Sequence, residues 1–200
     1  MAITPEKRRE ELRDLKRKAI LAAARRVCDT AGPDALTMRA VASEAGYAPG
    51  AVYSYFAGMD ELAIALTAEE LGHLARRMRE AAERADRPAA ALEAAAKEAL
   101  RAAAGNAPHA RLAGRLMSAE ALPADLDRAV TGRVIAILEA LGGPLRAATG
   151  FKGEAAHREI LCLAALLIGL RVLEGAGRLA PLGFTAEGLL AHRLEALPEA

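Results

Sequence analysis

Start and stop signals for two very short helices lie within residues 36–56, LTMRAVASEAGYAPGAVYSYF. Thr37 is a favourable N-cap, because its hydroxyl can accept a backbone N–H left unpaired at the start of a helix. Gly46 can end that helix, and Pro49 suits the first turn of the next one. Two short helices joined by a glycine-containing turn form a helix-turn-helix, which lays its second helix in the major groove of DNA.

Two tyrosines flank the apolar face of the second short helix. Val52 and Phe56 are spaced i, i+4 and are expected to share that face. Tyr53 and Tyr55 are two residues apart, so they cannot both lie on it, and at most one ring is expected to be buried. A tyrosine hydroxyl can donate to a phosphate oxygen, and such contacts position a protein on the duplex. The pattern therefore predicts that these tyrosines bind the DNA backbone.

The remainder of the chain is predicted to be helical. Alanine and leucine dominate and aromatic residues make up only 3%, a composition that favours helix over strand. The hydrophobic fraction of 53% is sufficient for a folded core. We expect an all-α fold, with helices beyond the two short ones at 6–31, 59–85, 88–104, 108–119, 124–141 (ending there or resuming after Gly142-Gly143-Pro144), 154–174 and 185–197.

Neither the cysteines nor the termini indicate export. Cys28 and Cys162 have apolar neighbours and no metal-binding spacing, so we expect both to be buried free thiols in a reducing compartment. The N-terminus is charged, unlike a signal peptide. The longest apolar run, residues 160–170, is too short to span a bilayer. We expect a cytoplasmic protein with no membrane partner.

Residues 36–62 resemble the DNA-binding segment of the tetracycline-repressor (TetR) family of one-component transcription regulators. The resemblance covers about the first third of the chain. It implies a helix-turn-helix DNA-binding domain of three helices at 1–58 and a helical-bundle effector-binding and dimerisation domain at 59–200. The matching residues are Thr37, Arg39, Val41, Ala42, Ala45, Gly46, Gly50, Val52, Tyr53, Tyr55, Phe56, Glu61 and Leu62.

The resemblance also implies a role for each position. Thr37 would cap the first helix of the motif and touch a phosphate, and Arg39 would reach a phosphate or a guanine edge. Tyr53 and Tyr55 would hold phosphates. The end of the second helix that enters the groove would comprise Ala48, Pro49, Gly50 and Ala51, with Ser54 beside them.

Two departures from the family pattern alter the expected binding. The family commonly has a lysine that pairs with a phosphate where this chain has Met59, so we expect a shallower salt dependence. Residues 48–51 also lack polar base readers. Methyl contacts to thymine and DNA shape must then supply much of the discrimination, with Arg39 as the main polar reader.

The first 26 residues carry nine basic and four acidic residues, an excess of five positive charges. This stretch could follow a neighbouring DNA backbone or the minor groove. A solvated helix face is an equally good interpretation, because Glu10, Glu11 and Asp14 interleave with the basic residues.

The helix at 154–174 is apolar nearly all round, so it must be covered on two sides. One side can be this chain's own core, and the other is most simply a second copy of the chain, although a central helix in a monomer would also fit. The resemblance likewise implies a homodimer formed by the last two long helices. The residues predicted for this interface are Leu161, Ala165, Ile168, Gly169, Val172, Leu190 and Leu194.

A pocket for a small-molecule effector is expected among the middle helices. The scarcity of aromatic residues favours an apolar, aliphatic or acyl-like effector. Each candidate lining residue could equally be plain core. The candidates are Leu112, Leu116, Met117, Ile135, Leu138 and Leu166.

These patterns predict a homodimeric transcription regulator, more specifically a repressor released from a palindromic double-stranded DNA operator by the effector. No catalytic constellation, metal site or cofactor is expected. One alternative is a di-iron four-helix bundle, because Glu70/His73 and Glu154/His157 have the required i, i+3 spacing. Another is a helical adaptor that uses the short helices to bind a protein.

Overall fold

A computed structural model describes residues 4–102 and 124–200, and all the regular structure in these ranges is helical. No helix in the described ranges is both long and apolar enough to cross a bilayer. The elements are α1 (Pro5–Ala31), η1 (Pro33–Ala35), α2 (Met38–Ala45), α3 (Pro49–Val52), α4 (Met59–Glu83), α5 (Pro88–Ala102), α7 (Ala124–Thr149), α8 (Gly153–Gly175), η2 (Ala180–Leu182) and α9 (Ala186–Glu195). The all-α prediction is confirmed, and the helix predicted at 108–119 lies outside the described residues.

The chain divides into two compact units. Of the described residues, the first unit comprises 4–68 and 124–126, and the second comprises 69–102 and 127–200. The division falls within α4, whereas the boundary predicted from the sequence lies where α4 begins.

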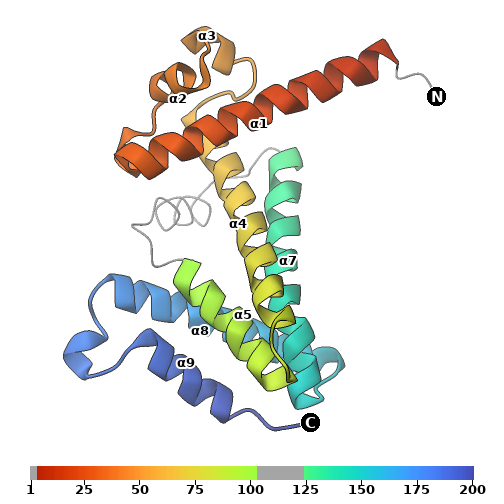
Figure 1. The fold of residues 1–200 in the computed structure, drawn as a ribbon, viewed down its shortest axis with the longest axis vertical. Coiled ribbons are helices and arrows are strands. Elements are labelled where there is room, and N and C mark those ends of the chain that lie inside the picture. The colour runs from red at the N-terminus through yellow and green to blue at the C-terminus, as the bar shows by residue number, and fades with distance from the viewer. Residues whose placement is uncertain (1–3, 103–123) are drawn as a thin grey trace. The chain divides into compact units, whose positions relative to one another are not determined.

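In the first unit, α2 packs against α1, and α3 packs against α2 (Figure 1). The apolar stripe of α1 supplies one side of the core, and the short helices supply the other. The N-terminal half of α1 extends past them (Figure 1). The core of this unit contains Ile20, Ala23, Ala24, Val27, Val41, Ala42, Val52, Phe56 and Leu62, each at most 8% exposed.

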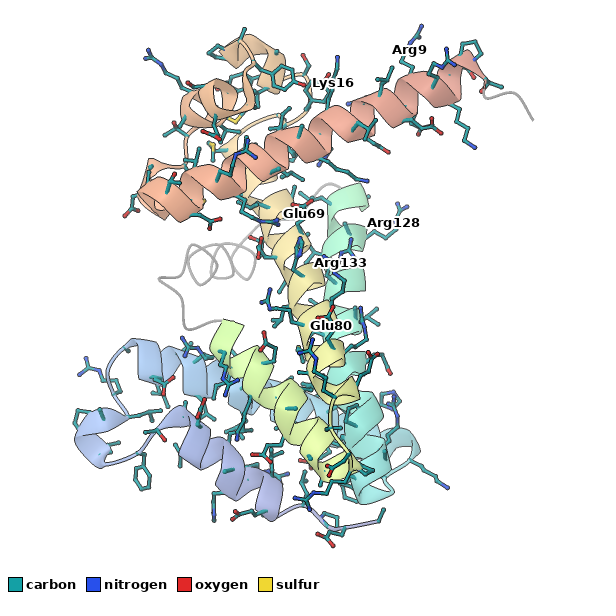
Figure 2. The ribbon with its side chains drawn as sticks, in the orientation of Figure 1. Arg9, Lys16, Glu69, Glu80, Arg128 and Arg133 are labelled. Carbon is teal, nitrogen blue, oxygen red and sulfur yellow. The ribbon has the colours of Figure 1, made fainter. Side chains whose placement is uncertain are left out.

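The second unit has its own core, formed by α4, α5, α7, α8 and α9. Its centre includes Met78, Leu141, Leu163 and Leu190, which are almost completely buried. Helices α5, α8 and α9 pack on one another, and α7 lies along α4 (Figure 1). At that contact the Arg133 side chain, labelled in Figure 2, approaches the backbone of α4 at Gly72, where an added Cβ would lie 3.1 Å from its Nε.

Helix α7 does not end at residue 141. It continues to Thr149 and contains Pro144 in its interior, which ordinarily costs about 3 kcal/mol. Leu141 and Leu145 flank Gly142-Gly143-Pro144 and are at most 1% exposed, so their burial in the core offsets the cost of the proline. Gly142 has a packing role, because a Cβ there would lie 2.7 Å from Cδ1 of Ile160 on α8.

The prediction of two buried cysteines is half right. Cys28 is buried in the first unit, and Cys162 is exposed on α8. The apolar neighbours of Cys162 suggested burial, but the preceding Leu161 is itself 57% exposed. An apolar neighbourhood in the sequence therefore did not mean that the position faces the core of this chain.

Candidate functional site

Helix α2 is bounded by the two residues that the sequence indicated. The Thr37 hydroxyl accepts the backbone N–H of Ala40 at 3.1 Å, which caps the first turn. Gly46 ends the helix in the left-handed conformation, with φ +72° and ψ 28°. Its N–H and that of Tyr47 return to the carbonyls of Ser43 and Ala42 respectively, so the helix end is well bonded. The elbow before α3 is therefore tightly fixed.

Helix α3 begins at Pro49 and comprises only four residues. The chain then continues in hydrogen-bonded turns, in which the N–H groups of Tyr55 and Phe56 both donate to the carbonyl of Val52. Val52 and Phe56 are at most 1% exposed, as their spacing predicts. These two side chains hold residues 48–55, here called the reading segment, against the core of the first unit.

The other side of the reading segment faces outward. Tyr53 is 55% exposed and Tyr55 is half-buried, so the two rings are not hidden together in the core. The nine residues predicted to contact DNA share one property, which is that none of them is buried. They are Thr37, Arg39, Ala48, Pro49, Gly50, Ala51, Tyr53, Ser54 and Tyr55.

Arg17 fixes the reading segment to the start of α4, and sequence reasoning missed this residue. Its guanidinium donates to the carbonyl of Tyr55 at 3.3 Å and to Glu61 at 3.2 Å, and it lies 4.4 Å from the centre of the Phe56 ring. Glu61 in turn accepts the backbone N–H of Ala57 at 2.7 Å. A signal was available, because Arg17 precedes Ile20 by three residues and therefore falls on the apolar stripe of α1.

Helix α8 has one buried face and one exposed apolar face. Ile160, Leu163, Leu167 and Leu170 lie in the core of the second unit. The opposite face exposes a stripe at i, i+4, i+7 and i+11 spacing, and Gly169 beside it is half-buried. This stripe, here called the α8 stripe, consists of Leu161, Ala165, Ile168 and Val172.

The α9 residues predicted for the same interface are not exposed as the α8 stripe is. Leu190 is completely buried in the core of its own chain, so its assignment to an interface is wrong. Leu194 is half-buried and packs against that core. The leucine spacing of α9 indicated an apolar face correctly, but that face packs against the core of the same chain.

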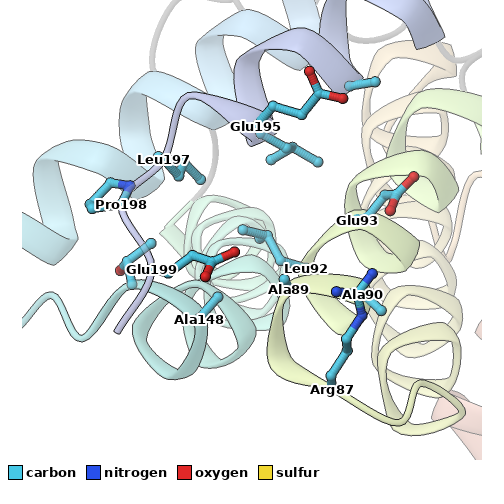
Figure 3. Close-up of a pocket in the computed structure, with 13 residues that line it drawn as sticks. Arg87, Ala89, Ala90, Leu92, Glu93, Ala148, Glu195, Leu197, Pro198 and Glu199 are labelled. Carbon is cyan, nitrogen blue, oxygen red and sulfur yellow. The ribbon is translucent and has the colours of Figure 1, made fainter.

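The structure describes three of the six residues predicted to line an effector pocket. Ile135 is 54% exposed, while Leu138 and Leu166 pack against the core. Leu112, Leu116 and Met117 lie outside the described residues. The described residues of the second unit also form a hollow of about 490 Å³ where α5 begins and α9 ends, and its lining includes Arg87, Leu92, Leu197 and Glu199 (Figure 3).

The two Glu-x-x-His pairs have other contacts. The Glu154 carboxylate pairs with Arg158 at 2.7 Å, and the ring of His73 contacts the Arg76 guanidinium at 2.7 Å. In the part of the chain that the structure describes, no three His, Cys, Asp or Glu residues are grouped so as to hold a metal ion. The geometry gives no support to the di-iron alternative.

A known protein family matches the part of the chain that contains the reading segment. The family described as "Bacterial regulatory proteins, tetR family" matches residues 20–66, which begin within α1 and end within α4. No curated protein matches the sequence.

Solved structures share the fold over most of the chain. The transcriptional regulator SCO7222, a TetR from Streptomyces coelicolor, is 25% identical with a TM-score of 0.59, over 80% of this chain and 72% of that one. A protein of unknown function from Rhodococcus sp. RHA1 is 20% identical with a TM-score of 0.69, over 90% of this chain and 92% of that one. The structure of the regulator FadR from Bacillus subtilis in complex with stearoyl-CoA is 19% identical with a TM-score of 0.64, over 89% of this chain and 95% of that one. Residues 20–66 of the chain are thus a TetR-family DNA-binding domain, and the chain as a whole shares the fold of a solved TetR regulator.

Proposed function

We propose that the protein is a homodimeric repressor that binds a palindromic operator through the reading segment and leaves it when a small apolar effector binds. The observation that carries this proposal is the orientation of the reading segment. Val52 and Phe56 are buried beneath it, while Tyr53 and its neighbours are exposed on a rigid elbow. Burial of both tyrosine rings would have removed the basis for DNA contact.

In this proposal, each of the nine residues predicted to contact DNA has a defined role. Tyr53 and Tyr55 donate to phosphates, Thr37 caps α2 beside a further phosphate, and Arg39 reaches a phosphate or a guanine. Ala48, Pro49, Gly50 and Ala51, with Ser54, lie against the bases, where methyl contacts and groove shape discriminate between sequences. The repressor then depends on few polar base contacts.

DNA binding can be tested with fragments from upstream of the protein's own gene, by gel shift or fluorescence anisotropy. Tyr53→Phe removes one hydrogen bond to a charged acceptor, so a loss of about 1.5 kcal/mol per half-site, roughly tenfold, is expected on every sequence. Arg39→Ala should also relax sequence preference if the guanidinium touches a base. Arg84→Ala, an exposed change in the turn that follows α4, is the charge control. Unchanged affinity in both test variants would contradict the site assignment.

Dimerisation is proposed to use the α8 stripe. Its apolar side chains are exposed at helical spacing on a helix whose other face is already buried, and Gly169 leaves room for close approach of a second helix. Ile168→Glu should therefore give a monomer in sedimentation analysis with little loss of thermal stability in the monomer itself. Val134→Glu changes an exposed valine of α7 in the same way and should remain dimeric. A dimer that survives Ile168→Glu would place the interface elsewhere.

The effector is proposed to bind among the middle helices, and its described candidate contacts are Ile135, Leu138 and Leu166 of the second unit. The other three candidates, Leu112, Leu116 and Met117, lie outside the described residues. Binding would shift the population toward a conformer whose two reading segments no longer fit successive major grooves. The structure of FadR from Bacillus subtilis is in complex with stearoyl-CoA, which suggests stearoyl-CoA as the first probe. Release of operator DNA by stearoyl-CoA, with no effect of coenzyme A alone, would support an acyl-like effector. No release would rule out this ligand while leaving DNA binding intact.

A further inference from the structure

The N-terminal half of α1 is a helical arm without a packing partner among the described residues. Residues 5–16 are exposed on every side, including Leu12 at 50% and Leu15 at 63%. Twelve residues correspond to roughly 18 Å of helix, visible in Figure 1 as the end of α1 that projects past α2 and α3. The helix start is nonetheless well specified, because the Thr4 hydroxyl accepts the N–H of Lys7 and Pro5 occupies the first position. The chain therefore specifies a helix here that contributes nothing to the core.

Charges that interleave in the sequence of this arm separate in three dimensions. Successive helical residues are about 100° apart, so Arg9, Arg13 and Lys16, at i, i+4 and i+7, share one face. Glu10 lies to one flank of that face, and Glu11 lies on the far side of the helix. Arg9 and Lys16 both project from the exposed side of α1 in Figure 2.

This basic face borders a groove on the reading segment. The groove has a volume of about 370 Å³, and its lining comprises Arg9, Leu12, Arg13, Lys16, Ser54 and Tyr55. Its lining includes no carboxylate from the described part of the chain. Within residues 4–102 and 124–200, neither arginine nor the lysine is paired with a carboxylate, whereas the next cation, Arg17, is held by Glu61. Three cationic residues and two hydroxyl-bearing residues thus line one groove.

We propose that this groove, here called the arm groove, binds phosphates of the DNA backbone in addition to those held by the reading segment. The inference rests on the proposed DNA binding and adds a second contact element to it. Arg9 and Lys16 are seven residues apart, which is roughly 10 Å along the helix, and phosphates follow one another every 3.4 Å of helix axis along a DNA strand. In this proposal the cations and hydroxyl donors of the groove contact phosphates and not base edges, so its contribution is independent of sequence. It supplies the electrostatic contacts that Met59 does not.

The test replaces the three cations together, as Arg9→Gln, Arg13→Gln and Lys16→Gln. The matched control replaces Lys7, Arg8 and Lys18 with glutamine on the other faces of the same helix. Both variants lose three positive charges and keep residues of similar helix propensity, so circular dichroism should show equal helix content. DNA affinity is measured for an operator fragment and an unrelated fragment between about 50 and 300 mM salt.

The arm-groove variant should show a slope of log affinity against log salt that is shallower by about 2.7 per protomer, since each phosphate contact contributes about 0.9. The same relation gives a loss of about 100-fold per protomer near 0.15 M salt, equal on both fragments. The control should remain close to wild type. Ethylation interference should reveal phosphates that the wild type contacts and the variant does not.

Two outcomes would overturn the inference. If the arm-groove variant and the control match in slope and affinity, the arm contributes only general charge. If the arm-groove variant loses affinity for the operator fragment alone, it reads bases rather than phosphates. Absence of DNA binding by the wild type would instead contradict the proposed function itself, so the two failures are distinguishable.

Discussion

Two glycines of the helix-turn-helix provide a matched test of how the elbow is built. Gly46 has φ +72°, a conformation that side-chain-bearing residues rarely adopt, whereas Gly50 lies in α3 without a positive φ. A Cβ added at either position would meet no atom within 4 Å. Replacement by alanine therefore introduces no clash at either site, and only the backbone conformation differs.

The expected effects have opposite signs. Gly46→Ala places alanine in the left-handed region at a cost of about 1–2 kcal/mol. Gly50→Ala should stabilise the protein by about 0.4–1 kcal/mol, because alanine loses less conformational freedom in a helix. For a chain of this length, 1 kcal/mol corresponds to about 2–4 °C in Tm. Gly46→Ala should thus melt a few degrees below wild type and Gly50→Ala slightly above it.

DNA affinity should not follow stability in this pair. Gly50 is exposed on the reading segment, so its added methyl group meets the DNA surface and should weaken binding despite the gain in Tm. Gly46→Ala should retain binding at temperatures where the protein is folded. Circular dichroism melting and anisotropy titration measure the two quantities. Equal Tm values for the two variants would refute the reasoning from the left-handed cap.

Three further predictions follow from the packing. Arg17→Ala should destabilise the first unit by about 1–2 kcal/mol in thermal melting, because it removes a partly buried ion pair and a cation–π contact. Arg26→Ala removes an exposed ion pair and should cost under about 0.5 kcal/mol in the same assay. Leu190→Ala should cost about 2–5 kcal/mol in denaturant unfolding because its side chain is fully buried. Gly142→Ala should cost about 1–3 kcal/mol by overpacking, and adding Ile160→Val should recover part of that loss; no recovery would contradict the close approach of α7 and α8.

The sequence predicted most of the helix boundaries because local chemistry determines them. Thr37, Gly46 and Pro49 act within one or two turns of the chain, and each has its predicted role in the structure. Spacing likewise predicted that Tyr53 and Tyr55 would not both be buried, and Tyr53 is 55% exposed. The roles of the reading-segment residues on DNA stay predictions, as does the effector pocket.

Errors arose where a distant contact decides the outcome. Gly142-Gly143-Pro144 is a strong local signal for the end of a helix, yet α7 continues past it because Leu141 and Leu145 are buried in the core. Leu190 and Ile168 both lie on apolar faces, and only tertiary packing distinguishes the core residue from the exposed one. The basic residues of α1 were ambiguous in sequence because their separation from the acidic ones appears only around the helix axis.

The position of the unit boundary inside α4 constrains how the protein can be recombined. Leu62 and Leu66 are at most 1% exposed and belong to the first unit, so a fragment that stops at residue 58 would lack part of that unit's core. Any chimera with another regulator must therefore be spliced within a continuous helix instead of a loop. There, inserting a single residue turns everything downstream by about 100° and advances it by about 1.5 Å. Exchange of sensing halves between such regulators is thus restricted to splices that preserve helical phase.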